Sequence, residues 1–335
     1  MLLALLLAVV LHGAAWSLRS RLYLLVDKMS KIAVVFPGQG SQFVGMGKDF
    51  YEKYTEIRKI FDKADEVLGY SLTSIMFEGP EEELKLTSNT QPALLTMSIG
   101  IWELVKNNIK ADFFAGHSLG EYSALVAAGG ISFEDAVLAV HNRGKFMQEA
   151  VPVGVGTMAA VMGASDELVA DVCKASSVDG FVVEPANFNC PGQIVVAGNT
   201  EAVNLFCGKI KEAGAKRALI LPVSAPFHCS LMKPAAEKMA EYLKKIKIND
   251  LSTPVYNNVD AVKETEASVV YDALVRQVAN PVLWTKSVYQ MTADGVSLFY
   301  EVGAGKVLNG LVKKINKEVE VKNIGTVADI ELAFS

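Results

Sequence analysis

Short apolar runs alternate with segments of helical periodicity along most of this chain. Ile32–Phe36 is a continuous apolar run, which is typical of a parallel strand covered on both faces. The Gly- and Pro-containing residues 37–41 end it. A second strand of this kind is predicted at Ser297–Val302. Helices are predicted at about 49–68, 92–106 and 133–150. Together these elements predict an α/β fold.

The pattern changes in the middle of the chain. Val153–Met162 is a β-rich run of small residues, and further elements follow it in close succession. They are predicted as a helix at about 165–175, strands at about 181–186 and 192–198, a helix at about 200–213 and a strand at about 216–223. This β-α-β-β-α-β order is typical of a ferredoxin-like unit. We therefore predict a core formed by residues 29–151 and 227–335, interrupted by a ferredoxin-like subdomain at 152–226.

Composition narrows the class of protein. The chain has 335 residues, of which 51% are hydrophobic and 21% charged, enough for one large domain or two smaller ones. A net charge of −5 argues against a nucleic-acid-binding protein, which normally carries a basic excess. The four cysteines are widely spaced and form no C-x-x-C pair, so a zinc ribbon or redox pair is not indicated. A reduced intracellular compartment fits this cysteine usage best.

The first 28 residues differ from the rest. Leu2–Leu11 is an apolar run too short to span a bilayer comfortably. Its length fits the apolar region of a signal peptide, but the basic residues Arg19 and Arg21 follow it instead of preceding it. We interpret residues 1–28 as an extension outside the folded unit. We favour the explanation that the start site was assigned too far upstream. A targeting segment and a weak membrane contact stay open as alternatives. We expect a cytoplasmic protein with no stable membrane association.

Gly116–Gly120 reads Gly-His-Ser-Leu-Gly and fits the G-x-S-x-G nucleophile elbow. An apolar run at 113–115 precedes it, and apolar residues at helical spacing follow it until Gly129. Such a strand–turn–helix exposes the serine hydroxyl at the top of a sheet, and the helix N-terminus favours developing negative charge. A buried serine in a glycine-rich turn is the alternative, but this context favours Ser118 as a nucleophile.

A nucleophilic serine needs a base, and the chain has only four histidines. His12 lies in the extension, and His117 adjoins Ser118, where its side chain should point away from the hydroxyl. His141 falls in the middle of a predicted helix, as an ordinary packed or exposed residue. His228 lies in a proline-containing loop where the predicted subdomain rejoins the core. Elimination therefore favours His228 as the base, although a lone loop histidine is usually solvent-exposed.

Other residues could complete an acyl-transfer site. An oxyanion hole needs backbone N–H groups, which Leu119 and the Gly-Gln-Gly loop around Gln39 could supply, although that loop could also be a plain turn. Arg143 lies at the edge of the apolar stripe of helix 133–150, to which Met147 belongs. Its guanidinium suits a carboxylate, with a surface salt bridge as the alternative. Spacing alone does not select Gln277, whose amide oxygen or carbonyl could orient an imidazole.

Five motifs in this order resemble the malonyl-CoA:acyl carrier protein transacylase family of fatty-acid synthesis. They are Phe36–Gln42, Gly116–Tyr122, Arg143–Met147, Ala225–His228 and Gln277–Pro281. The resemblance covers about residues 31–325, nearly everything after the extension. It implies an α/β-hydrolase-like core with an inserted ferredoxin-like α+β subdomain.

The resemblance also implies roles in catalysis. Ser118 would be acylated and His228 would be the base. Gln277 would orient His228 through its backbone carbonyl. The backbone amides of Gln39 and Leu119 would form the oxyanion hole. The implied reaction needs neither a metal nor a resident cofactor.

Substrates and partner follow from the same resemblance. Arg143 would hold the malonyl carboxylate of malonyl-CoA, beside Met147 and Phe227, and Phe227 matches the malonyl-type pattern. The acceptor would be the phosphopantetheine thiol of acyl carrier protein. Because that partner is generally acidic, Lys216 and Arg217 are candidates for docking it, with ordinary solvated surface residues as an equal alternative.

Three alternatives stay open. The carrier protein could serve a polyketide synthase instead of fatty-acid synthesis. A serine esterase uses the same elbow but places its histidine near the C-terminus, and a patatin-like lipase would pair Ser118 with a late Asp-Gly such as Asp294-Gly295. A non-catalytic scaffold that binds carrier protein or is attached to a membrane is the third, and the intact candidate residues argue against it.

Overall fold

The computed structural model describes residues 30–223 and 225–334, so the extension expected at 1–28 lies outside the described residues. The strands in that part are β1 (Lys31–Phe36), β2 (Phe113–Gly116), β3 (Gly156–Met162), β4 (Val183–Cys190), β5 (Gln193–Asn199), β6 (Arg217–Ile220), β7 (Val255–Tyr256), β8 (Lys263–Glu264), β9 (Val296–Val302) and β10 (Glu320–Ile324). The helices are α2 (Lys48–Lys53), α3 (Thr55–Leu68), α4 (Leu72–Glu78), α5 (Glu81–Lys85), α6 (Thr87–Val105), α7 (Gly120–Ala127), α8 (Phe133–Ala150), α9 (Asp166–Ser176), α10 (Thr200–Glu212), α11 (Lys233–Leu243), α12 (Ala267–Gln277), α13 (Trp284–Ala293), α14 (Val307–Ile315) and α15 (Val327–Phe334), with a 3₁₀ turn at Ser230–Met232.

A six-stranded sheet forms the centre of the larger part of the molecule. Its order is β10-β9-β1-β2-β7-β8, and all neighbours are parallel except β8, which runs antiparallel to β7. In β1, Ala33 and Val35 pack in a cluster with α13 and α14, whereas Val34 and Phe36 pack on the other face with α6 and α7. Burial of both faces explains why β1 is a continuous apolar run, as the sequence predicted.

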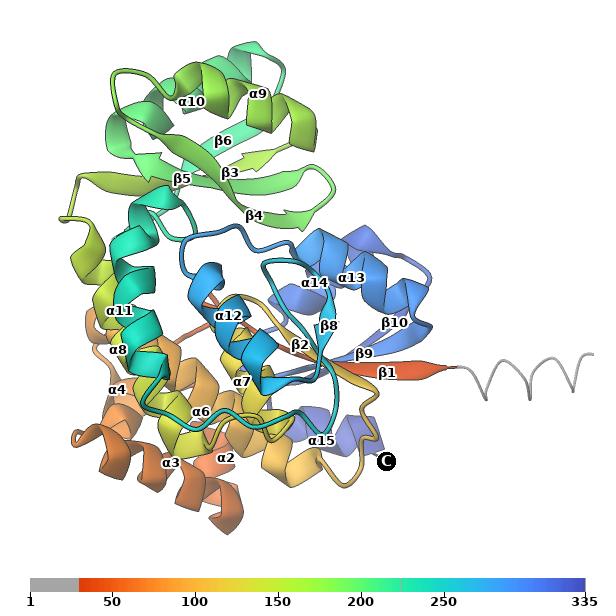
Figure 1. Ribbon diagram of the computed structural model, residues 1–335. Helices are drawn as coiled ribbons and strands as arrows, with labels where there is room; N and C mark the ends of the chain where they lie inside the picture. The colour runs from red at the N-terminus through yellow and green to blue at the C-terminus, as the bar shows by residue number, and fades with distance from the viewer. Residues whose placement is uncertain (1–29, 224, 335) are drawn as a thin grey trace, which may run out of the picture.

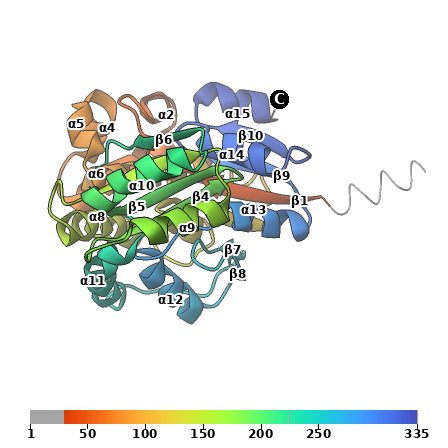
Figure 2. The ribbon, with the colours of Figure 1, turned by 90° about the horizontal axis from the view of Figure 1, so that it is seen from above.

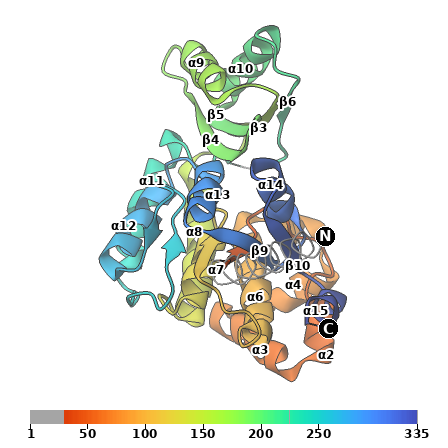
Figure 3. The same cartoon turned by 90° about the vertical axis from the view of Figure 1, so that its right-hand side faces the viewer.

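A separate four-stranded antiparallel sheet has the order β4-β5-β3-β6. Its elements follow in the predicted order β3-α9-β4-β5-α10-β6. Helices α9 and α10 pack against one face. Figure 1 shows this sheet and its helices above the rest of the molecule, Figure 2 shows them from above, in front of the core, and Figure 3 shows the same arrangement from the side. Backbone hydrogen bonds join β4 to the core, from Val282 N to Ala186 O (2.9 Å) and from Phe188 N to Val282 O (2.9 Å).

Two predicted helices differ from the structure in their bounds. The helix expected at 49–68 is broken into α2 and α3 at Tyr54, which has extended backbone (φ −118°, ψ 116°). The helix expected at 92–106 begins earlier, at Thr87, and so has Pro92 inside it. A proline has no N–H for the carbonyl four residues before it, Ser88 O. His141 Nδ1, on α8, lies 2.8 Å from that oxygen and satisfies it. This contact gives the mid-helix histidine a structural role.

Among the described residues, no helix combines the length and the apolar character that a membrane crossing requires.

The elbow between β2 and α7 is pressed against the end of β1. A Cβ added to Gly120 would lie 2.2 Å from Phe36 O, and a Cβ on Gly116 would lie 1.9 Å from the carbonyl carbon of Gly120. Both neighbours are backbone and cannot yield as a side chain would. The two glycines of the motif are therefore required by close approach of main chains.

We expect Gly120→Ala to lower the free energy of unfolding by about 1–3 kcal/mol or more, because the added methyl overpacks this contact. Gly208→Ala, in the interior of α10 with open space around it, is the matched control and should raise stability by about 0.5–1 kcal/mol. Urea denaturation of both variants measures the difference. Equal stability of Gly120→Ala and the unaltered chain would contradict the packing argument.

Candidate active site

Ser118 lies at the tip of the elbow, between the last residue of β2 and the first residue of α7. Its φ of 53° places a non-glycine residue in the left-handed region, a strained conformation that is typical of a nucleophile elbow. The strained turn directs its hydroxyl into a cavity between the two sheets. The expected strand–turn–helix is therefore confirmed.

His228 lies beside this serine. Its Nε2 is 2.7 Å from Ser118 Oγ, and its Nδ1 is 2.8 Å from the backbone oxygen of Gln277. A carbonyl oxygen can only accept, so Nδ1 carries the proton and Nε2 is left to accept from the serine hydroxyl. The structure thus brings together three residues that lie far apart in the sequence. His228 is also in the left-handed region (φ 60°) and is buried, so it is not the solvent-exposed loop histidine of the alternative interpretation.

Burial, reinforced by the nearby Arg143, lowers the pKa of His228 to about 3. The imidazole is therefore neutral at neutral pH, which is the form that can accept a proton. Gln277 ends α12, and the partial negative charge of a helix C-terminus favours an imidazolium that forms later. This carbonyl occupies the place that an aspartate takes in a Ser-His-Asp triad.

Arg143 is buried, with only 1% of its surface exposed. Its guanidinium donates to Gln91 Oε1 (2.8 Å), to Gln277 Oε1 (2.8 Å) and to Ser118 Oγ (3.1 Å). Burial lowers the pKa of Arg143. No carboxylate of the described residues forms an ion pair with it, so the surface salt bridge of the alternative interpretation is absent there. A buried cation whose hydrogen-bond acceptors are neutral amide and hydroxyl oxygens is a site for an anion.

A cavity of about 280 Å³ lies over these groups. Its lining contains Ser118, His228 and Arg143 together with Gln39, Met147 and Phe227, all candidates from the sequence. The remaining lining residues are Gln91, His117, Met158, Ala160, Asn187, Asn189, Gln193, Val195, Leu221 and Val223. His117 Nε2 bonds Asn189 Oδ1 (2.9 Å), away from the serine hydroxyl as expected. Strands of the small sheet thus line one cavity together with loops and helices of the core.

The two amides expected for an oxyanion hole lie next to the serine. Gly38 packs so closely on the elbow that a Cβ there would be 2.4 Å from His117 O, which holds the neighbouring Gln39 beside the turn. Leu119 directly precedes the first residue of α7. Within residues 30–223 and 225–334, neither Gln39 N–H nor Leu119 N–H donates a hydrogen bond. Both N–H groups are therefore unengaged, as the donors of an oxyanion hole must be.

Sequence reasoning missed several residues of this site. Gln91 holds Arg143 from α6, and no local motif indicates it. Glu121 is fully buried behind the elbow, and its Oε2 accepts from Gln277 Nε2 (3.0 Å) and Asn258 N (2.8 Å). Burial, followed by the neighbouring Glu264, raises the pKa of Glu121 to about 8. Its only sequence signal is its place inside the motif Gly116–Tyr122.

Two sequence suggestions lie elsewhere. Lys216 and Arg217 are exposed at the start of β6, the edge strand of the small sheet, and neither lines the cavity. Strands β2 and β9 run in the same direction, because both pair in parallel with β1. Asp294 lies just before β9 and Ser118 lies just after β2, so the two residues are at opposite ends of the sheet. Asp294 instead accepts from Lys263 Nζ (2.7 Å). The patatin-like pairing of Ser118 with Asp294 is therefore wrong.

Comparisons with known proteins identify relatives along nearly the whole chain. The model of the acyl transferase domain family matches residues 33–330. The malonyl CoA-acyl carrier protein transacylase of Bacillus subtilis (strain 168) is 51% identical over 91% of this chain and 97% of its own length. The protein of that name from Escherichia coli (strain K12) is 54% identical over 86% of this chain and 93% of its own length.

Solved structures give the same result. An acyl carrier protein S-malonyltransferase from Vibrio cholerae O1 superposes with a TM-score of 0.88 and 49% identity, over 91% of this chain and 100% of that chain. The PlMCAT:AntF (holo) structure holds a type II PKS acyl-carrier protein in complex with its malonyl-transacylase. One of its chains superposes with a TM-score of 0.88 and 46% identity, over 91% of this chain and 99% of that chain. By sequence and by structure, this chain belongs to the acyl transferase domain family.

Proposed function

We propose that this chain transfers the malonyl group from malonyl-CoA to the phosphopantetheine thiol of acyl carrier protein, in fatty-acid biosynthesis. The observation that carries the proposal is the buried guanidinium of Arg143, which has no carboxylate partner among the described residues and lies 3.1 Å from Ser118 Oγ. An acyl group that ends in a carboxylate would place its charge on Arg143 and its thioester at Ser118. The names of the relatives agree with this substrate.

The first half of the reaction acylates the enzyme. His228 Nε2 takes the proton of Ser118 as Oγ attacks the thioester carbonyl. The N–H groups of Gln39 and Leu119 hold the resulting oxyanion. When the tetrahedral intermediate collapses, the C–S bond breaks and the CoA thiolate takes the proton from His228. The product is a malonyl ester of Ser118.

The second half reverses these steps with another thiol. The phosphopantetheine thiol of the carrier protein gives its proton to His228 and attacks the ester carbonyl. Collapse breaks the bond to Ser118 Oγ, which recovers its proton from the imidazolium. One thioester has replaced another, so the reaction is reversible and should follow ping-pong kinetics.

Arg143 would also set the selectivity for the acyl group. A malonyl carboxylate pairs with the guanidinium, while Met147 and Phe227 form part of the cavity wall. An acetyl group offers no anion and leaves the buried cation unpaired, at a cost of about 1–3 kcal/mol or more.

The fold supports a finer description that belongs to the same proposal. We assign residues 29–151 and 227–335 to an α/β-hydrolase-like core and residues 152–226 to a ferredoxin-like subdomain. The β-α-β-β-α-β order and the strand order β4-β5-β3-β6 support the second assignment. We also propose a reducing, cytoplasmic location, because all four cysteines are free and buried.

A second candidate is a trans-acting acyltransferase of a polyketide synthase. The similarity to a transacylase solved with a type II PKS acyl-carrier protein favours it specifically. The chemistry at Ser118 would be the same, and only the carrier protein would differ. Parallel assays with both kinds of carrier protein would separate the two.

We expect one malonyl adduct per chain when the protein is incubated with malonyl-CoA alone, and none in Ser118→Ala. The reason is that the first half-reaction needs no carrier protein. Intact-mass measurement detects the adduct. Rapid release of free malonate without an adduct would indicate a hydrolase, and neither adduct nor turnover would leave the scaffold interpretation.

Arg143→Ala should lose its preference for malonyl-CoA over acetyl-CoA by about tenfold or more, because only the malonyl group uses the guanidinium. Acylation by both donors, followed by mass spectrometry, gives the ratio. Arg58→Ala, an exposed arginine on α3, is the matched control and should keep the preference. An equal loss of rate for both donors would refute the carboxylate role.

The Lys216→Glu/Arg217→Glu variant should raise the KM for carrier protein several-fold and leave the KM for malonyl-CoA unchanged, if these residues dock an acidic partner. Lys245→Glu/Lys247→Glu, with the same charge change just beyond the end of α11, is the control. The assay varies carrier protein at fixed, saturating malonyl-CoA. An unchanged KM removes Lys216 and Arg217 from the docking surface.

A further inference from the structure

The loop between β7 and β8, residues 257–262, has no role in the chemistry above and yet contacts the catalytic elements. It is tied to itself by hydrogen bonds from Asn257 N to Val262 O (3.0 Å) and from Asp260 N to Asn257 Oδ1 (2.8 Å). Asn257 Nδ2 also donates to Glu264 Oε2 (2.9 Å). Asn257 and Asn258 are fully buried. This segment is referred to below as the 257–262 loop.

One side of the 257–262 loop holds the nucleophile. Asn258 Oδ1 accepts the backbone N–H of Ser118 (2.6 Å), and Asn258 Nδ2 donates to Gly116 O (2.7 Å). One amide side chain therefore clamps the elbow on both sides of His117. The strained φ of Ser118 persists only where its surroundings fix it, and these two bonds are such a constraint.

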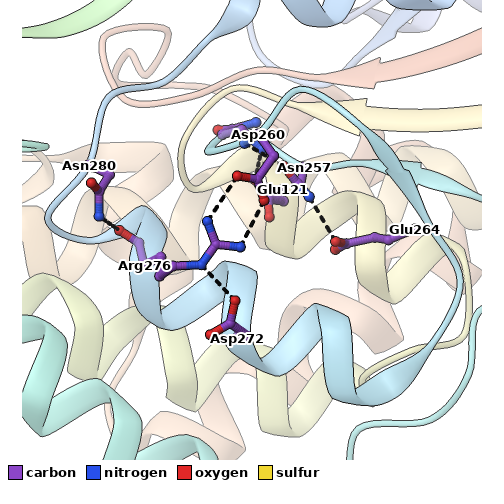
Figure 4. A network of polar contacts seen from close by, with 8 residues as sticks. Glu121, Asn257, Asp260, Glu264, Asp272, Arg276 and Asn280 are labelled. Atoms are coloured by element: carbon purple, nitrogen blue, oxygen red, sulfur yellow. Dashed lines mark hydrogen bonds and ion pairs between the residues drawn. The ribbon is translucent and has the colours of Figure 1, made fainter.

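The other side of the 257–262 loop holds the end of α12, to which the base is bonded. Asp260 accepts a bidentate pair from Arg276, with Oδ1 at 3.0 Å from one guanidinium nitrogen and Oδ2 at 2.7 Å from the other. Arg276 directly precedes Gln277, whose backbone oxygen binds His228. Asn280 Nδ2 donates to Arg276 O (2.8 Å) and closes the same turn. Figure 4 shows Arg276 between Asp260 and Asp272, with Asn280 on the turn beyond it.

We propose that the 257–262 loop positions both members of the Ser118–His228 pair, with Asn258 fixing the serine and Asp260 fixing the helix end that orients the histidine. The inference rests on the proposed function of that pair. Ser118 and His228 lie 110 residues apart in the sequence. The loop is bonded directly to the serine segment, and it reaches the histidine through Arg276 and the adjoining Gln277. Asn258 and Asp260 are positioning residues, because neither lines the cavity.

A positioning role predicts a loss of rate without a loss of affinity. Asn258→Ala and Asp260→Asn should each lower the rate constant for Ser118 malonylation, at saturating malonyl-CoA, by about tenfold or more, because small displacements of reacting groups are costly. The half-saturating concentration of malonyl-CoA should stay within about twofold of the unaltered protein. Rapid quench followed by intact-mass measurement gives both quantities.

The chain offers matched controls. Asp272 is the second carboxylate on Arg276, bonded to its Nε at 2.6 Å, but it belongs to α12 itself and does not reach the loop. Asp272→Asn should therefore acylate within about twofold of the unaltered protein. Asn309→Ala, another buried asparagine, controls for the loss of a buried amide. A urea midpoint for every variant verifies folding.

A charge exchange tests the link directly. Asp260→Arg and Arg276→Asp should each lose rate, and the double variant should recover most of it, because the ion pair is rebuilt with its charges reversed. Asp260 and Arg276 are partly exposed, and pairs of this kind contribute little to stability, so these variants should fold even if Asn258→Ala does not.

The outcomes separate the two proposals. If folded Asn258→Ala and Asp260→Asn acylate as fast as their controls, the positioning role is wrong while the function stands. A rise in the half-saturating concentration with an unchanged rate constant also overturns it. If the unaltered protein forms no adduct on Ser118, the proposed function itself is wrong.

Discussion

The burial of one guanidinium governs the arrangement of this site. Arg143 loses its hydration without gaining a carboxylate among the described residues. Two glutamine oxygens, from α6 and the end of α12, accept its hydrogen bonds and offset part of the free-energy cost of desolvation. Burial lowers the pKa of His228 most, and the charge of Arg143 lowers it further, so the imidazole stays neutral. Gln277 connects the two, because its side chain accepts from Arg143 and its backbone oxygen accepts from His228. Gln277 therefore couples the anion site to the base.

The strained turn beneath these groups depends on contacts between main chains. Glycines at 116 and 120 let β2 and α7 approach each other and the end of β1, so Ser118 is raised at the carboxyl edge of the sheet. The small sheet then covers that edge, joined to the core through Val282. A cavity of about 280 Å³ between the two is a consequence of that arrangement.

Local signals in the sequence predicted what local contacts determine. The apolar run of β1, the elbow, helix 133–150 and the order of the small sheet's elements all depend on neighbours within a few residues, and the structure has each of them. Gln91 and Asn258 act across 52 and 140 residues, and no pattern nearby marks them. His228 was found only because the chain has few histidines. The break at Tyr54 was missed because both helices share one apolar periodicity.

The neutral acceptor on His228 suits the first half of the reaction, in which the leaving group is a thiolate. A carbonyl at a helix end stabilises an imidazolium less than an aspartate would. A thiol is already acidic, with an ordinary pKa of about 8.5, so a departing thiolate needs little help from a general acid. In the second half of the reaction the leaving group is the more basic Ser118 alkoxide, which the imidazolium has to protonate. Because the neutral carbonyl of Gln277 stabilises that imidazolium only weakly, the ring remains a strong acid and gives its proton to Ser118 Oγ readily. One neutral acceptor is therefore compatible with both halves of the exchange.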